Sequence, residues 1–445
     1  MVRRTPSKLR LPPLGEEQRP PASGNLVPWT VTGLVAATIV VGLVARESGL
    51  DWGTPAPPLT LFWDPVFSGW LWAAAAGLLA SLAAAFYLYR ADWPVWAYGV
   101  ALFGLALFSR LALNLARMGP EAWYAPNVVR PASSGRLEYL AAMEELKVGV
   151  ASFLDNFAEL VPTLPLHVAG HPPGLVVFLD LFGLETPELM SALTIVVGAV
   201  LSPLIYLLGR RLYDERTARL AAMLSIFAPT ALIYGATTAD ALFATLALVA
   251  AFFLLSERAR GVVFGAVALA FASFFSYALL VVGGWAGLVR WRRDGFGGMA
   301  FAAISCGVAL LVFYGLLAIL TGFDVLGSIE ATHDRYFNGV ASIRPYLFYF
   351  FGSPAAFLFM LGPIAWYASR SLGSREIGAV ALAVAILLTV LVGYTKAETE
   401  RIWIFFLPMA CLAAARALPE RHLRPVLVAL VAQALVIEVV YYTMW

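Results

Sequence analysis

Apolar runs of about 20 residues, each long enough for a helix to cross a bilayer, recur from residue 25 to the end of this chain. Within a bilayer no water is present to hydrogen-bond the backbone, and an apolar run that forms a helix satisfies its own N–H and C=O groups. The apolar runs therefore favour membrane-spanning helices. Of the 445 residues, 61% are apolar and 13% are charged, whereas about 25% are charged in an average soluble protein. The sequence therefore predicts an all-α membrane protein with many spans.

Hydropathy predicts about thirteen membrane-spanning helices. Their expected ranges are 26–46, 68–89, 94–117, 187–208, 217–234, 240–256, 260–275, 277–291, 298–320, 344–366, 377–394, 401–416 and 424–443. A shorter apolar segment, 172–184, cannot cross the bilayer and is expected as a half-helix. In 137–160, apolar residues at helical spacing predict amphipathic helices on the membrane surface.

The basic residues set the expected orientation. With the N-terminus in the cytoplasm, most Lys and Arg residues fall in cytoplasmic connections, as the positive-inside rule requires. Counting 172–184 as a full span would move Arg210, Arg211 and the basic segment 290–293 to the outside. We therefore expect a multi-pass protein of the cell membrane whose largest loop, 118–186, is extracytoplasmic.

The expected spans and loops divide the chain into five segments. In order, they are a cytoplasmic basic tail (1–24), three spans including an added hairpin (25–117), the extracytoplasmic loop with juxtamembrane helices (118–186), core spans (187–293) and C-terminal spans with outer loops at 322–343 and 395–400 (294–445). Because no small-residue cleavage site follows the first apolar run, we expect an uncleaved tail and first span.

Three carboxylates are candidates for catalysis. Glu138 lies where the large loop enters its first amphipathic helix, and its apolar neighbours would partly desolvate it, which suits a general base. Asp155, in the same loop, is the alternative base. Asp240 opens a predicted span, and there it either faces a polar cavity or caps its helix. The competing interpretation is that most acids of the loop belong to a solvated helix face.

Histidine and basic side chains are candidates for binding a phosphate group. His167 and His171 precede the Pro-Pro turn that opens 172–184, and a helix N-terminus favours an anion. Lys396 and Arg401 belong to a charged segment, 395–401, in which an arginine can bind phosphate oxygens with two hydrogen bonds. The alternatives are a capped turn with hydrated histidines and a charged segment that neutralises itself.

Four further residues are expected to support this site: Arg110, Tyr139, Glu398 and Glu400. Arg110 falls inside an apolar span, where a guanidinium group needs a polar partner. The chain has four histidines and two cysteines and lacks the spacing of a zinc site, so no metal ligands are predicted. Participation of a divalent cation stays open, and no basic block with interleaved aromatics indicates nucleic acid.

The order of these motifs resembles that of GT-C superfamily glycosyltransferases. The chain is most similar to the group of protein O-mannosyltransferases and lipid A aminoarabinose transferases (glycosyltransferase family 39). The matching pieces are Glu138-Tyr139, His171-Pro172-Pro173, Leu208-Gly209-Arg210-Arg211-Leu212-Tyr213, Thr238-Ala239-Asp240 and Glu400-Arg401-Ile402-Trp403. The chain departs from the family at Leu137, where an Asp is usual, and in the added hairpin 26–89 that precedes the loop.

The resemblance implies an enzyme that takes a sugar from a polyprenyl-phosphate donor at the outer face of the membrane. The sugar would pass to an acceptor glycan, lipid or protein with inversion at the anomeric carbon. Glu138 would be the base, His171, Lys396 and Arg401 would approach the donor phosphate, and Asp240 would support the site. The alternatives are a lipid or polysaccharide transporter or flippase, and a polyprenyl-linked polymer ligase or polymerase.

Overall fold

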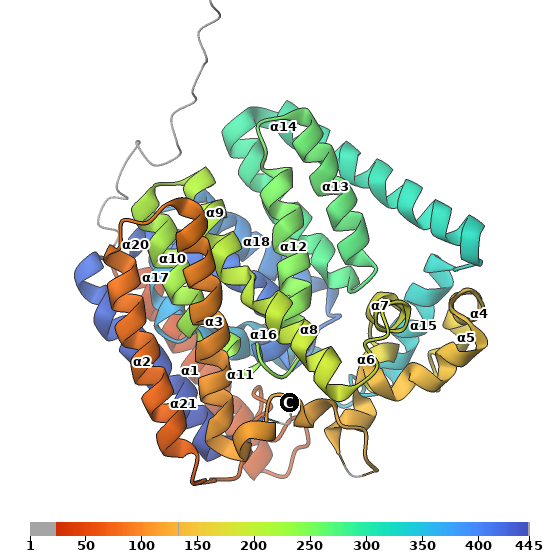
Figure 1. Cartoon of the computed structure of the whole chain (residues 1–445), viewed down its shortest axis with the longest axis horizontal. Helices are drawn as coiled ribbons and strands as arrows, with labels where there is room; N and C mark the ends of the chain where they lie inside the picture. Colours follow the sequence, from red (N-terminus) through yellow and green to blue (C-terminus); the bar gives the residue numbers. More distant parts are fainter. Residues whose placement is uncertain (1–23, 132, 444–445) are drawn as a thin grey trace, which may run out of the picture.

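The computed structural model describes residues 24–131 and 133–443, so nearly all of the predicted tail lies outside the described residues. The described chain is a bundle of helices (Figure 1), and its short β-strands, β1 (Phe62–Trp63) and β2 (Tyr441–Tyr442), form one antiparallel pair. The all-α prediction is therefore confirmed.

The helices follow the order of the predicted segments. The first are α1 (Leu26–Glu47), α2 (Leu71–Arg90) and α3 (Val95–Met118). The large loop holds η1 (Gly119–Glu121), η2 (Ala125–Asn127), η3 (Ser134–Leu137), η4 (Tyr139–Val148), α4 (Val150–Asp155), α5 (Phe157–Leu160), α6 (Leu166–Ala169) and α7 (Gly174–Leu181). Next come α8 (Pro187–Ala199), α9 (Leu201–Leu212), α10 (Glu215–Phe227), α11 (Pro229–Ile233), α12 (Asp240–Leu254), α13 (Ala259–Ser273) and η5 (Tyr277–Leu279).

The C-terminal part continues with longer helices and ends near the N-terminal hairpin. Its elements are α14 (Leu280–Thr321), α15 (Val325–Asn338), α16 (Tyr346–Leu361), α17 (Pro363–Gly373), α18 (Ile377–Val392), α19 (Thr399–Ile402), η6 (Trp403–Phe406), α20 (Leu407–Ala417), η7 (Glu420–His422) and α21 (Leu423–Val440). Figure 1 shows the short loop helices α4 to α7 gathered with α15 at the lower right of the bundle.

The number of spans predicted from hydropathy requires correction. Within the described residues, six helices are long and apolar enough to cross a membrane, or up to seven if the bent pair α16–α17 is one span. That is fewer than the predicted thirteen or so. The helices α12, α13 and α18 cover predicted spans but contain 15, 15 and 16 residues. At about 1.5 Å per residue they are roughly 23 Å long, which is less than the roughly 30 Å core of a bilayer.

Proline and glycine interrupt two further predicted spans. Pro229 starts α11 immediately after α10, so the predicted span 217–234 is interrupted. Gly362 and Pro363 separate α16 from α17, which are bent by 114° relative to each other. The segment 172–184 contains only the eight-residue α7, in agreement with a helix too short to cross.

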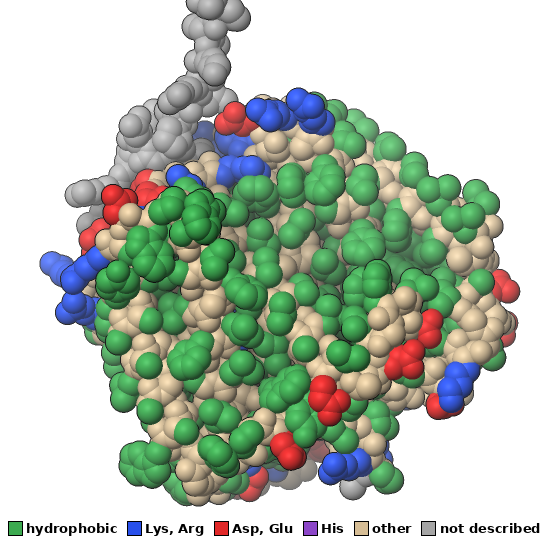
Figure 2. Space-filling model, viewed as in Figure 1, with side chains coloured by type: hydrophobic (Ala, Val, Ile, Leu, Met, Phe, Trp, Pro, Cys, Tyr) green, Lys and Arg blue, Asp and Glu red, His purple; other side chains and the backbone are tan. Residues whose placement is uncertain are grey.

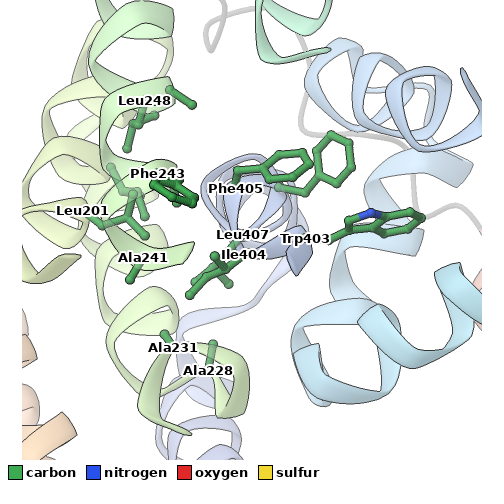
Figure 3. Packing of buried hydrophobic residues seen from close by; sticks show 14 of the residues in the cluster. Leu201, Ala228, Ala231, Ala241, Phe243, Leu248, Trp403, Ile404, Phe405 and Leu407 are labelled. Atoms are coloured by element: carbon green, nitrogen blue, oxygen red, sulfur yellow. The ribbon is translucent and has the colours of Figure 1, made fainter. Parts of the chain in front are cut away.

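Apolar side chains fill the interior and also cover much of the surface. Figure 3 shows part of the core, where Phe243 of α12 faces Phe405 and Ile404 of η6, with Leu201 of α9 nearby. On the face shown in Figure 2, hydrophobic side chains predominate and charged side chains lie mostly near the edges. Large apolar residues of α14 are strongly exposed, including Leu311 at 78% and Ile319 at 82%. An apolar surface of this kind is compatible with a membrane protein.

The two ends of α12 have different polar surroundings. At its C-terminal end, Arg290 donates hydrogen bonds to the carbonyls of Leu254 and Ser256, and Arg293 donates to that of Leu255. Such contacts satisfy carbonyls that have no partner within the helix. Its N-terminal end begins at Asp240, which lies among the charged residues described next.

Candidate functional site

Arg401 contacts two carboxylates, one buried and one largely buried, at the N-terminal end of α12. Its Nη1 donates a hydrogen bond of 2.8 Å to Oδ2 of Asp240, and its Nη2 donates one of 3.0 Å to Oε2 of Glu398. The side chains of Arg401 and Asp240 are only 7% and 6% exposed. Residues 161 positions apart thus form a charge cluster that is removed from solvent.

An unusual backbone turn brings Glu398 into this cluster. The turn follows α18, and Ala397 and Glu398 both have positive φ values, of 67° and 57°. Residues other than glycine seldom adopt this region, and such strained positions are concentrated at functional sites. The turn allows Glu398 to contact Arg401 from the side opposite to Asp240.

A second arginine extends the cluster. Nη2 of Arg344 donates to Oε1 of Glu398 at 2.9 Å, and its Nη1 donates to the carbonyl oxygen of Lys396 at 2.7 Å. The backbone N–H of Lys396 donates to the hydroxyl of Tyr336 at 2.7 Å. Glu398 therefore accepts from two guanidinium groups, whereas the Lys396 ammonium contacts the Ala341 carbonyl at 3.5 Å.

The large loop contributes a carboxylate and two imidazoles. Oε1 of Glu138 lies 2.9 Å from Nδ1 of His167, within ion-pair distance, and both side chains are buried. Nε2 of His167 lies 3.5 Å from Nη2 of Arg401. The His171 Nδ1 is 2.9 Å from the His167 carbonyl and 3.4 Å from the Tyr139 hydroxyl. These contacts join the large loop to the cluster around Arg401.

A cavity of about 510 Å³, here called the main cavity, adjoins this group. His167, His171, Lys396, Glu398 and Arg401 line it on the polar side. Its apolar lining includes side chains of α14 and α18: Leu280, Val281, Leu388 and Val392. The last two are 53% and 60% exposed, so the cavity wall continues into the apolar outer surface of α18.

Burial and neighbouring charges set the ionisation of the site. Burial alone would raise the pKa of Glu398, but the charges of Arg401 and Arg344 outweigh it and lower the pKa to about 2. Burial lowers the pKa of His171, which favours its neutral imidazole. Burial also raises the pKa of the Tyr139 hydroxyl well above its ordinary value, with a further contribution from Asp240.

Three predicted site residues lie elsewhere. Glu400 is buried but directed away from the main cavity, and its Oε1 accepts a 2.6 Å hydrogen bond from the N–H of Thr60. Asp155 is exposed at the end of α4 and lies beside Gly322. Arg110 is buried between helices and donates to the Gly235 carbonyl at 3.4 Å. None of the three lines the main cavity. Glu138, Tyr139 and Asp240 do not line it either, but each contacts a residue that does: His167, His171 and Arg401, respectively.

Sequence reasoning missed Arg344 and Tyr336. Arg344 directly precedes the apolar run of α16, so the argument applied to Asp240, a charge at the boundary of an apolar segment, would have identified it. Tyr336 lies in an amphipathic helix with no comparable signal. Its role depends on a contact with Lys396, which is 60 residues away.

Within residues 24–131 and 133–443, no group of three or more His, Cys, Asp or Glu side chains could hold a metal ion. Comparison of the sequence with known protein families and with curated proteins finds no match. The chemistry of the site is therefore argued from its own residues.

Proposed function

We propose that the chain is a GT-C type membrane glycosyltransferase that uses a polyprenyl-phosphate sugar donor. The observation that supports this most is the composition of the main cavity. A buried cluster of carboxylate, imidazole and basic groups shares one cavity with apolar residues that continue onto the exposed surface of α18. A donor with a charged head and a long apolar chain needs both kinds of lining.

In the proposed orientation, the N-terminus is cytoplasmic and the main cavity opens on the extracytoplasmic side of the cell membrane. The apolar chain of the donor lies along α14 and α18, and its phosphate approaches Lys396 and Arg401. Arg401 is shared with Asp240 and Glu398. The Lys396 ammonium contacts a backbone carbonyl instead, so Lys396 supplies a positive charge that is not shared with a carboxylate in this way. A basic group stabilises the phosphate as negative charge develops on it.

The proposed reaction is a single displacement at the anomeric carbon. The acceptor oxygen forms a bond to that carbon while the bond from carbon to the phosphate oxygen breaks, and the configuration inverts. The acceptor proton passes to the buried Glu138–His167 pair, and the electron pair leaves with the phosphate. Asp240 keeps Arg401 in place beside His167.

Replacing Glu138 tests the role of the base. In Glu138→Gln, we expect sugar transfer to fall by about a hundredfold or more, the usual contribution of a general base, while donor binding persists. The matched control is Glu144→Gln in the same loop, because the Glu144 side chain is 78% exposed. Transfer is measured with purified protein and a panel of polyprenyl-phosphate sugars. Full activity of Glu138→Gln would exclude Glu138 as the base.

Replacing the cations tests the phosphate site. In Lys396→Ala and Arg401→Ala, we expect weaker binding of polyprenyl phosphate, whereas Lys147→Ala on the surface should bind normally, since Lys147 is 69% exposed. Equal affinity in all three variants would refute the phosphate role. Donor binding without any hydrolysis or transfer, combined with lipid movement across vesicles, would favour a flippase instead.

A further inference from the structure

A second, smaller cavity lies beside the proposed active site and has a different chemical character. Its volume is about 210 Å³, and it is formed where α3 ends, where α21 ends and where the large loop begins. Here it is called the small cavity. Its lining includes Asn114, Ser134, Thr237, Glu438 and Tyr442.

Several polar groups of the small cavity have no partner within the described residues. Asn114 is only 8% exposed, and its amide makes no hydrogen bond there. The carboxylate of Glu438 and the hydroxyl of Ser134 likewise make no hydrogen bond or ion pair within that part of the chain. Because these groups line the small cavity, a molecule bound there can reach them. These groups are therefore suited to receive a ligand.

The hydrogen-bonding properties of these polar groups indicate which class of ligand the small cavity can bind. An amide and a hydroxyl both donate and accept hydrogen bonds, and a carboxylate accepts them. The half-exposed ring of Tyr442 adds an aromatic surface. Arg117, the basic residue of the lining, is already engaged with Asp64 and with backbone carbonyls of Glu438 and Tyr441. With Arg117 engaged in this way, a neutral polyhydroxylated molecule can use the donors, acceptors and ring of the small cavity together.

Two short segments connect the small cavity to the proposed catalytic residues. Ser134 precedes Glu138 by four positions, and Thr237 precedes Asp240 by three. A segment of four residues spans at most about 14 Å. A molecule in the small cavity would thus contact segments that carry both carboxylates within a few residues, and these lining residues differ from those of the main cavity.

We infer that the small cavity binds a neutral polyhydroxylated group, such as a sugar ring, and positions it as the acceptor. The binding site follows from the unpaired groups of the small cavity, whereas its role as acceptor site rests on the proposed function. Asn114 and Glu438 hold the hydroxyl groups, and Tyr442 packs against the ring.

Direct binding tests this inference without requiring transfer. Purified full-length protein is titrated with methyl glucoside, methyl mannoside and methyl galactoside, and binding is followed by calorimetry. We expect at least one of these glycosides to bind, and its affinity to fall by about tenfold or more in Asn114→Ala and in Glu438→Leu, as the loss of a hydrogen bond to a charged or buried group predicts. Tyr442→Ala, at a more exposed position, provides a variant with less risk of misfolding and should also weaken binding.

The control is Lys147→Ala, which alters a side chain that is 69% exposed and should leave glycoside affinity unchanged. If no methyl glycoside binds, or if all variants bind equally, the inference is wrong. Polyprenyl phosphate is titrated into the same samples. Glycoside binding without polyprenyl phosphate binding would overturn the proposed donor but support the small cavity, and the reverse pattern would overturn the small cavity alone.

Discussion

Glu398 is a largely buried carboxylate that contacts two guanidinium groups, so its contribution to stability depends on pH in a defined direction. Its pKa lies at about 2 instead of 4.5, because Arg401 and Arg344 outweigh the effect of burial. A carboxyl whose pKa is lower in the folded state stabilises the fold above the unfolded pKa. That contribution is therefore complete above about pH 4.5 and is lost as the pH falls through about 2.

Glu398→Gln should accordingly destabilise the protein at neutral pH and progressively less below pH 4.5. A pKa difference of this size corresponds to roughly 3 kcal/mol, at about 1.4 kcal/mol per unit. Thermal unfolding at pH 7, 4.5 and 3 measures the difference between variant and wild type. Glu144→Gln is the exposed control. A difference that stays constant down to pH 3 would contradict the predicted pKa.

Asp240 can be tested in the same way at neutral pH. Removing one partner of a buried ion pair typically costs about 3–5 kcal/mol, and because Arg401 retains its contact with Glu398, the loss here should lie at the lower end of this range. We expect Asp240→Ala to lower the free energy of unfolding by that amount, because Arg401 is 7% exposed. The control is Asp334→Ala, whose side chain is 64% exposed next to His333, with an expected change of at most about 1 kcal/mol. Similar losses in the two variants would show that the Asp240–Arg401 pair contributes no more to the free energy of unfolding than an exposed pair does.

At this scale, some site residues could be predicted from sequence and others could not. Asp240, Glu398 and Arg401 are charges at the boundaries of apolar segments, where burial near a polar cavity is the natural expectation. The contact of Glu400 with Thr60 joins residues 340 positions apart, and no local pattern indicates it. The sequence therefore predicts that the charged residues of segment 395–401 share one site, whereas Glu400 does not line the main cavity.

At the level of elements, hydropathy located helical segments but not their ends. An apolar run continues through Pro229 or Gly362, whereas the helix does not, since proline removes a backbone donor and glycine permits a sharp change of direction. The long α14 has such a break at Gly295, with φ 74° and ψ −177°. This matches the two separate runs 277–291 and 298–320 expected from the sequence.

Gly295→Ala tests whether this break depends on glycine. The backbone conformation at Gly295 is nearly exclusive to glycine, and forcing another residue into it costs about 1–3 kcal/mol. A Cβ atom there would meet no other atom within 4 Å, so the loss can be assigned to the backbone. Gly297→Ala is the matched control, because its Cβ is also unobstructed and its φ is not positive. It should be neutral or stabilising by about 0.5–1 kcal/mol. Equal unfolding temperatures for the two variants would refute the strain at Gly295.

At the scale of the whole molecule, the N-terminal hairpin contacts the segments that carry the candidate site. The loop between α1 and α2 reaches the C-terminal helices. The Thr60 N–H donates to Glu400, the Tyr349 hydroxyl donates to the Trp52 carbonyl at 2.8 Å, and Thr54 contacts the same hydroxyl at 3.0 Å. Displacing this loop should therefore disturb the backbone that carries Arg401.

Gly42→Ala should displace that loop without altering any residue of the site. A Cβ at Gly42 would lie 1.8 Å from the carbonyl oxygen of Pro57, so α1 and the loop must separate. Such overpacking costs typically about 1–3 kcal/mol. We expect that loss of unfolding free energy, faster hydrogen exchange in both 51–62 and 399–402, and weaker binding of polyprenyl phosphate. Gly33→Ala, in the same helix with nothing within 4 Å, should leave all three unchanged or slightly improved. Faster exchange confined to 51–62 would show that the site is held independently of the hairpin.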